Sequence, residues 1–167
     1  MKPQTVHHTL EPLFDENSRV LILGTMPSPK SREAGFYYYH PQNRFWRVLS
    51  AVLEEPLPET IEGRRALCLR WGIALWDVLA SCEIEGAADA AIRHPVPNDI
   101  PWLVRQADIR AIFCTGAKAH ELYQKLIFPT FGVPAVRLPS TSPANAAWSI
   151  PKLYEKYCII NEFAKER

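Results

Sequence analysis

Four short apolar segments, each followed by a turn and a helical pattern, constrain this chain more than any other feature of its sequence. Segments that are apolar at every position are typical of strands buried on both faces, as in a parallel sheet between two helix layers. The sequence therefore predicts a single domain over residues 1–167 with an α/β fold, three layers (α/β/α) built on a central, mainly parallel four-stranded sheet. The expected strands are 19–24, 73–76, 111–114 and 133–138.

The segments between these strands carry helical patterns. Apolar residues recur at helical spacing after Asn43, Asn98 and Ser149, and each of these side chains can cap a helix N-terminus. The same spacing follows Pro58 and Gly116. The expected helices are 43–53, 59–71, 98–106, 116–128 and the segment that follows Ser149.

Two segments have neither pattern. Residues 1–18 are polar and mixed, so His7 and His8 are expected in solvent rather than as metal ligands. Residues 81–98 are small and polar and include two prolines, which predicts a long loop with room for one helical turn. The apolar side chains expected to pack from the first segment against the sheet edge are Leu10, Leu13 and Phe14.

Charge, apolar runs and cysteine spacing indicate which partners and which cellular compartment to expect. With a net charge of +1, nucleic-acid binding would depend on local clusters of Lys and Arg. No apolar run has the length of a signal peptide or of a membrane span, so we expect a cytoplasmic monomer, associated with the nucleoid in a bacterium, and no membrane partner. The four cysteines form no C-x-x-C pair and are expected as buried reduced thiols, with a zinc or iron–sulfur site as the less favoured alternative.

Three loops should meet at the carboxyl edge of the sheet, where open α/β sheets bind their ligands. They contain residues 24–43, Asp77 and residues 138–145. The first loop has neither a G-x-x-x-x-G-K-[ST] nor a G-x-G-x-x-G pattern, which argues against ATP or NAD. The chain also lacks the G-x-S-x-G turn of α/β hydrolases.

Four consecutive aromatic residues, 36–39, stand in the first loop. Because an extended segment cannot direct four rings into one core, some of them should line a surface cleft. Aromatic faces near Lys30, Arg32, Arg44 and Arg47 would suit a flipped nucleobase and its flanking phosphates. On composition alone, two core rings and two surface rings without function explain the run equally well.

The motifs of these loops resemble those of the uracil-DNA glycosylase superfamily over residues 19–157. The matching stretches, in order, are GTMPSP, HPQNRFW, GIALWD and LPSTSPANA. HPQNRFW in particular resembles the mismatch-specific uracil-DNA glycosylases. Taken together, the pattern is most similar to the hypoxanthine-DNA glycosylase group.

The resemblance implies a monofunctional enzyme of base-excision repair whose partner is DNA that contains deaminated bases. Such an enzyme flips the base out of the duplex and hydrolyses the N-glycosidic bond by water attack on an oxocarbenium-like sugar, with no metal and no other cofactor. Hypoxanthine is the first expected substrate and uracil the second. Met26 stands where better-known branches carry Asn or Asp, so a binding protein for modified bases or nucleotides that does not cleave them is the alternative.

Two polar residues are the expected catalytic pair. By the resemblance, Asn43 is the important Asn of the H-P-x-N motif; its amide can hold a water or contact the base but cannot act as a general base, and it can cap a helix at the same time. Asp77 follows a strand at the place where relatives carry a base-reading residue. A carboxylate there accepts the ring N–H of hypoxanthine or uracil and refuses adenine and cytosine by about 1–3 kcal/mol. Activation of water, a helix cap and an Arg partner are alternative roles for Asp77.

The resemblance also implies base-binding and DNA-binding residues. Tyr38 is the expected stacking platform, with Tyr39 and Phe36 as substitutes if the register differs by one, and Gly24 and Met26 complete the base pocket. His40 contacts a phosphate or locks its own loop. The other residues expected at DNA are Arg44, Ser140, Thr141 and Ser142, with Ala144 and Asn145 at the place where relatives insert a wedge into the duplex.

Overall fold

The central sheet is parallel throughout and has four strands, as the sequence predicts. The computed structural model describes residues 4–84 and 92–166. The strand order is β3-β2-β6-β7, and each pair of neighbours is parallel. The strands are β2 (Val20–Gly24), β3 (Ile73–Asp77), β6 (Ala111–Thr115) and β7 (Val136–Leu138).

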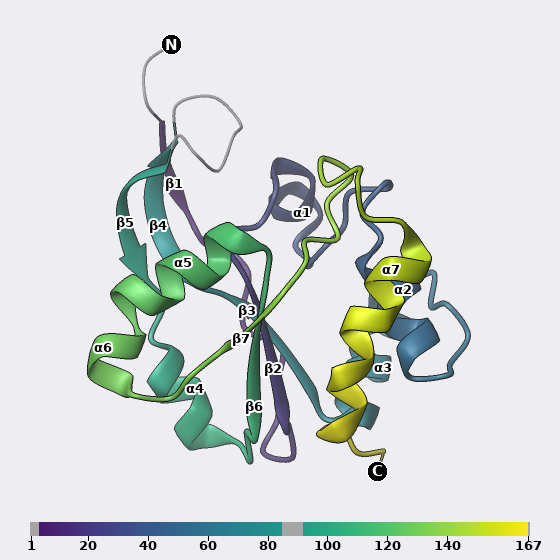
Figure 1. Ribbon diagram of the computed structural model, residues 1–167. Helices are drawn as coiled ribbons and strands as arrows, with labels where there is room; N and C mark the ends of the chain where they lie inside the picture. Colours follow the sequence, from purple (N-terminus) through teal and green to yellow (C-terminus); the bar gives the residue numbers. More distant parts are fainter. Residues whose placement is uncertain (1–3, 85–91, 167) are drawn as a thin grey trace.

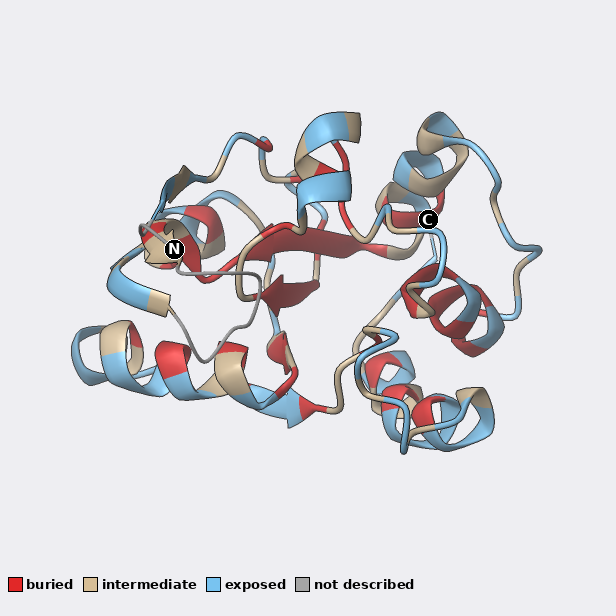
Figure 2. Cartoon of the chain, turned by 90° about the horizontal axis from the view of Figure 1, so that it is seen from above, coloured by how far each residue is buried: buried red, intermediate tan, exposed pale blue. Residues whose placement is uncertain are grey.

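Helices cover both faces of this sheet and confirm the three-layer α/β/α prediction. Figure 1 shows α2, α3 and α7 on one side of the strands and α4, α5 and α6 on the other, and Figure 2 shows the strands as a buried centre. The helices are α1 (Pro29–Ala34), α2 (Phe45–Val52), α3 (Ile61–Trp71), α4 (Ile100–Gln106), α5 (Ala117–Leu126), α6 (Phe128–Phe131) and α7 (Ile150–Tyr157), and a 3₁₀ turn spans Cys158–Glu162.

One of the three predicted helix caps is found, and two are not: the N-cap of α2 is Arg44 and not Asn43, and it makes no side-chain cap bond. Ser149 accepts the backbone N–H of Lys152 and caps α7, as predicted. Helix α4 is capped by Asp99 and not by the predicted Asn98. The Asn98 amide instead donates to the backbone carbonyls on either side of Val78, at 2.9 and 3.0 Å. Because that side chain ties down the chain after β3, it is not available as a helix cap.

The prediction of a loop over residues 81–98 is wrong for its described part. Residues of this segment form β4 (Leu79–Ile84) and β5 (Ile92–Pro97), which with β1 (Gln4–His7) make an antiparallel sheet in the order β1-β4-β5. Pro95 and Pro97 suggested a loop, because proline is rare inside sheets. Here they lie in β5, an edge strand, where proline is tolerated. Residues 85–91, which the prediction also covered, lie outside the described residues.

The segment before β2 packs closely against the core. Leu10 and Leu13 are buried, as predicted, and Leu13 pairs with Leu75 in an isolated antiparallel bridge. Phe14 packs against the ring of Trp102 at 5.7 Å. The prediction for His8 is wrong: His7 is exposed, but the imidazole of His8 is only 3% exposed. A histidine in a polar stretch carries no sequence signal of burial, and only the path of the chain shows it.

The remaining predictions concern cysteines and membranes. All four cysteines are free, and Cys68, Cys82 and Cys114 are buried, as predicted, while Cys158 is half-buried. Among the residues that the structure describes, no helix has both the length and the apolar surface needed to cross a bilayer.

The central strand β6 offers a test of the fold. Phe113 is fully buried there, and its register partner on β7, Val136, is 44% exposed. We expect Phe113→Ala to lower the free energy of unfolding by about 3–5 kcal/mol, because it leaves a cavity beside the sheet. Val136→Ala, the control at the same register, should change it by about 0.5 kcal/mol or less. Urea denaturation followed by circular dichroism measures both, and equal effects would contradict this assignment of the core.

Candidate active site

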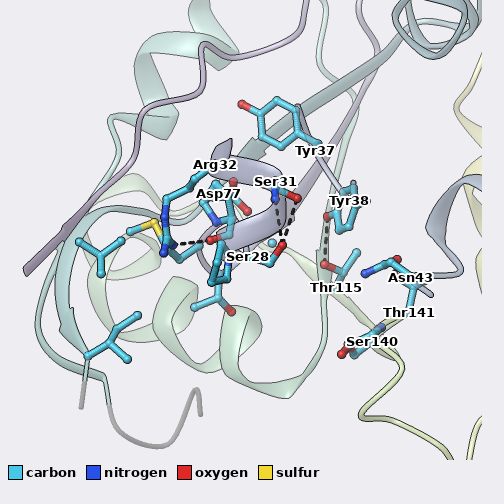
Figure 3. A pocket seen from close by; sticks show the side chains of 18 of the residues that line it. Ser28, Ser31, Arg32, Tyr37, Tyr38, Asn43, Asp77, Thr115, Ser140 and Thr141 are labelled. Carbon is cyan, nitrogen blue, oxygen red and sulfur yellow. Dashed lines mark hydrogen bonds between the residues drawn. The ribbon is translucent and has the colours of Figure 1, made fainter. Parts of the chain in front are cut away.

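A cavity of about 380 Å³ lies at the carboxyl edge of the parallel sheet. Its size falls in the range of small-ligand sites, about 300–1,000 Å³. The walls come from the loop after β2, the ends of β3 and β6, and the loop after β7, and Figure 3 shows their side chains gathered around it. The antiparallel sheet, which the sequence did not predict, adds a further wall through Gln4, Val6, Ile84 and Ile92.

Asp77 is the buried acid of the cavity. Its side chain is 6% exposed, and Oδ2 accepts a hydrogen bond from Nε2 of His8 at 2.8 Å. The other oxygen, Oδ1, lies over Gly24, where a Cβ atom would stand only 2.5 Å away. The register pairs Gly24 with Asp77, so a residue without a side chain is needed opposite this carboxylate.

Burial is the largest influence on the pKa values of Asp77, Tyr37 and Tyr38. It raises the pKa of Asp77, and the hydrogen bond and charge of His8 act in the opposite direction. Burial also raises the pKa of Tyr37 and of Tyr38 well above the ordinary value, and the nearby Asp77 carboxylate raises both further. The two phenols therefore stay neutral and can serve as hydrogen-bond donors at every working pH.

Asn43 presents its amide nitrogen to the cavity. The backbone N–H of Phe45 donates to Oδ1 at 2.9 Å, and the hydroxyl of Thr141 donates to the same oxygen at 2.8 Å. Because a backbone N–H can only donate, these bonds fix which end of the amide is oxygen. Asn43 lines the cavity, and Figure 3 shows its nitrogen on the side of Thr115. The side chain therefore accepts the first N–H of α2 from one residue before the N-cap position, which Arg44 occupies, and its nitrogen is left as a donor for a ligand.

Tyr38 is the aromatic wall. One face of its ring is stacked on Phe45, with centroids 3.9 Å apart and planes inclined by 11°. Its hydroxyl pairs with the hydroxyl of Thr115 at 3.2 Å. The backbone of Tyr38 has φ = 52°, an unfavourable conformation for a residue with a side chain, and one found often at functional sites.

The other two aromatics of the predicted platform lie elsewhere. Phe36 is buried in the core, where its ring stacks on Trp46 at 5.7 Å, and Tyr39 is 40% exposed outside the cavity lining. Gly35, with φ = 74°, ends α1 just before the four rings, and the backbone turns again within them at Tyr38. Met26 and Gly24, the other residues predicted for the base pocket, line the cavity together with Tyr38.

Arg44 holds the loop that follows β7. Its Nη2 donates to the carbonyls of Ser142 at 2.9 Å and Asn145 at 3.1 Å, and further donors reach the carbonyls of Thr141 and Trp148. The guanidinium group is thus committed to the protein backbone. Arg44 was predicted to contact DNA directly. In the structure it binds the loop after β7, which is itself predicted to contact DNA.

That loop is further ordered by its own side chains. The hydroxyls of Ser140 and Ser142 accept the backbone N–H groups of Ser142 and Ala144, and the Asn145 amide donates to the carbonyl of Ser140. Ser140, Thr141 and Ser142 line the cavity, whereas Ala144 and Asn145 do not. His40 lies outside the lining, and its Nδ1 accepts the N–H of Gln42, which fixes the turn before Asn43.

Two polar residues at the site, Thr115 and His8, are among those that sequence reasoning missed. Thr115 lies at the carboxyl end of β6, one residue beyond the predicted strand, so the strand-end reasoning that found Asp77 could have found it. His8 had no such signal. Within residues 4–84 and 92–166, no three His, Cys, Asp or Glu side chains group as metal ligands.

The fold and the cavity define an α/β protein with a pocket at the carboxyl edge of a parallel sheet, lined by a carboxylate, an amide and an aromatic ring. The sequence model of the uracil-DNA glycosylase superfamily matches residues 11–163. The chain belongs to this superfamily of DNA glycosylases.

Individual relatives agree with this membership. The chain is 34% identical to a hypoxanthine DNA glycosylase of Methanosarcina acetivorans over 82% of this chain and 87% of the relative. It is 33% identical to a hypoxanthine DNA glycosylase of Methanosarcina barkeri over 80% and 85%. A solution structure from Methanosarcina acetivorans, described as a candidate uracil DNA glycosylase, matches with a TM-score of 0.78 and 28% identity over 95% of this chain and 99% of that one.

The loop held by Arg44 can be tested without a substrate. We expect Arg44→Lys to loosen residues 138–149, because a single ammonium group cannot span the carbonyls that the planar guanidinium reaches. Amide hydrogen exchange of this loop should speed up by about tenfold or more, given about 1–2 kcal/mol for the lost hydrogen bonds. Arg47→Lys, an exposed position on the same helix, is the control. Unchanged exchange in Arg44→Lys would show that other contacts hold the loop.

Proposed function

We propose that this chain is a DNA-repair glycosylase that hydrolyses the N-glycosidic bond of a deaminated base, with hypoxanthine preferred and uracil second. The observation that carries the proposal is the pairing of one acceptor and one donor in the same cavity. Asp77 supplies a carboxylate oxygen and Asn43 supplies an amide N–H. The names of the relatives from Methanosarcina support the choice of hypoxanthine.

The acceptor and the donor match the chemical change that deamination makes. Adenine and cytosine present a ring nitrogen that accepts and an exocyclic amine that donates, whereas hypoxanthine and uracil present a ring N–H beside a carbonyl. Asp77 can accept that N–H and Asn43 can donate to that carbonyl. An adenine in the same place would leave both buried groups unpaired, at about 1–3 kcal/mol each. Guanine shares the carbonyl and N–H, but its stable pairing with cytosine makes its extrusion costly.

The chemistry proposed here is led by departure of the base. Met26 lines the cavity at the place of the usual polar residue and cannot activate water. Asn43 cannot do so either, because its oxygen is occupied by Phe45 and Thr141. Its N–H can instead stabilise the negative charge that gathers on the departing base. As the C1′–N bond breaks, water adds its hydroxide to C1′ and its proton ends on the base. None of the described residues that line the cavity is a lysine, which supports hydrolysis by water alone.

The loop after β7 is the proposed contact to the DNA backbone. Each hydroxyl of Ser140 and Ser142 accepts a backbone N–H, which leaves its own hydrogen for a phosphate oxygen. Arg44 keeps this loop ordered before DNA arrives, so binding would need little further ordering of the chain. The flipped nucleotide would then enter between this loop and Tyr38.

The function can be tested with duplexes that carry one hypoxanthine or one uracil. We expect alkali to break the strand at hypoxanthine after incubation with the protein, and no break before alkali, as for a monofunctional enzyme. Asn43→Ala should lower the rate by about 100-fold or more, as loss of one well-placed donor does, while DNA binding persists. Gln42→Ala, an exposed neighbour, is the control. If the wild type cleaves no deaminated base, the protein is a binder and not an enzyme.

Asp77→Asn separates base reading from water activation. An amide at this position can donate as well as accept, so selectivity for hypoxanthine over adenine should fall by about 5- to 150-fold, the equivalent of 1–3 kcal/mol. If Asp77 instead activates water, cleavage of every substrate falls together and selectivity stays unchanged. Single-turnover rates on hypoxanthine, uracil and adenine duplexes distinguish the two roles.

A further inference from the structure

The N-terminal strand places a histidine behind the base pocket, against the carboxylate of Asp77. His8 directly follows β1, and its backbone N–H donates to the carbonyl of Ala80 at 2.7 Å. This bond extends the pairing of β1 with β4 and places the imidazole beside Asp77. The rings of Tyr37 and Trp76 flank it at 6.2 and 6.5 Å, and little of it reaches solvent. The sequence motifs of the superfamily noted above do not include this segment.

We propose that His8 is a positioning residue, which holds the Asp77 carboxylate so that one oxygen alone faces the base. This inference rests on the proposed function, in which Asp77 reads a ring N–H. The histidine is not catalytic, because it acts on the substrate only through Asp77.

Among the described residues, His8 alone donates a hydrogen bond to Oδ2 of Asp77. Oδ2 is occupied by His8 at 2.8 Å, and Oδ1 lies over the bare α-carbon of Gly24, close to the place of the Tyr38 hydroxyl. With Oδ2 fixed, the carboxylate cannot rotate to offer its other oxygen. A base therefore meets a single acceptor in one direction, which is what recognition of one ring N–H requires.

His8 also opposes the effect of burial on the charge. Burial raises the pKa of Asp77, and His8 is the neighbour whose hydrogen bond and charge lower it. From the loop after α1, Tyr37 and Tyr38 face the same corner, and both remain neutral phenols. Arg65 of α3 acts on the far side, on Tyr37. Among the described groups that act on the pKa of Asp77, His8 is thus the one that favours the ionised, acceptor form.

A pH dependence follows from this arrangement. A protonated carboxyl donates a hydrogen bond and no longer matches a ring N–H, so cleavage should fall as the pH drops through the pKa of Asp77. Without His8, the effect of burial is unopposed and that pKa lies higher. The acid limb of the rate profile should therefore move to higher pH when the histidine is replaced.

Two substitutions separate orientation from charge. His8→Gln keeps a neutral N–H donor in reach of Oδ2, and His8→Leu removes the donor. We expect His8→Leu to lower kcat/KM on hypoxanthine duplexes by about tenfold or more, as for a lost hydrogen bond to a charged group, and His8→Gln to restore most of it at alkaline pH. The acid limb should lie at higher pH in both variants. His94→Gln is the control, because His94 forms a 2.8 Å pair with Glu83 that is 78% exposed at the imidazole.

A second measurement does not depend on cleavage. Carbon-13 NMR of the side-chain carboxyls, with the Asp77 signal assigned by its loss in Asp77→Asn, reports the pKa of Asp77 in the free protein. We expect this pKa to be higher in His8→Gln than in the wild type and unchanged in His94→Gln. An equal pKa in His8→Gln and wild type would overturn the inference, even in an active enzyme. Absence of cleavage by the wild type would overturn the proposed function and leave the NMR result to decide on His8.

Discussion

Gly24 and Asp77 lie opposite each other in the parallel register of β2 and β3, and the contact between them governs the pocket. Any side chain at residue 24 would meet Oδ1 at 2.5 Å and the Tyr38 hydroxyl at 3.3 Å. A carboxylate can therefore lie inside the protein only because the neighbouring strand presents bare backbone to it. Burial then destabilises the charged form of Asp77, and His8 from the N-terminal segment partly offsets this by a hydrogen bond to the carboxylate. The parallel sheet and the added antiparallel strand thus meet at one acid.

On the opposite wall of the cavity, the side-chain oxygen of Asn43 joins the loop before α2 to the loop after β7. Oδ1 of Asn43 receives the N–H of Phe45 from its own helix and the hydroxyl of Thr141 from the loop after β7. Arg44, the next residue, fastens the same loop by its carbonyls. Contact with the helix start and donation to a ligand are therefore compatible roles of Asn43. The two bonds to its oxygen turn the amide so that its nitrogen faces the cavity.

Sequence reasoning reached the parts of this structure that follow local rules. Uniformly apolar runs give the parallel strands, and the strand-end rule places Asp77 at the edge with the loops. It missed β5 and β1 because edge strands are partly exposed and can contain proline, so they resemble loops. It missed His8 because its burial depends on a partner 69 residues away. It did not resolve the run of four aromatics, because the backbone turns within the run at Tyr38, with φ = 52°, a detail that composition does not contain.

The loss of a polar side chain at Met26 fits an enzyme that selects its substrate before any water reacts. In the proposed mechanism no side chain removes a proton from water, so the rate depends on how readily a base leaves and how well the pocket holds it. Asn43 favours departure by donating to the base, while Asp77 admits bases that carry a ring N–H. A base that pairs weakly in the duplex costs least to extrude. Hypoxanthine, a purine without the pairing strength of guanine, meets these conditions, and uracil carries the same ring N–H beside a carbonyl. The pocket chemistry therefore supports deaminated bases as a class, and the proposed order of hypoxanthine before uracil rests on the names of the relatives.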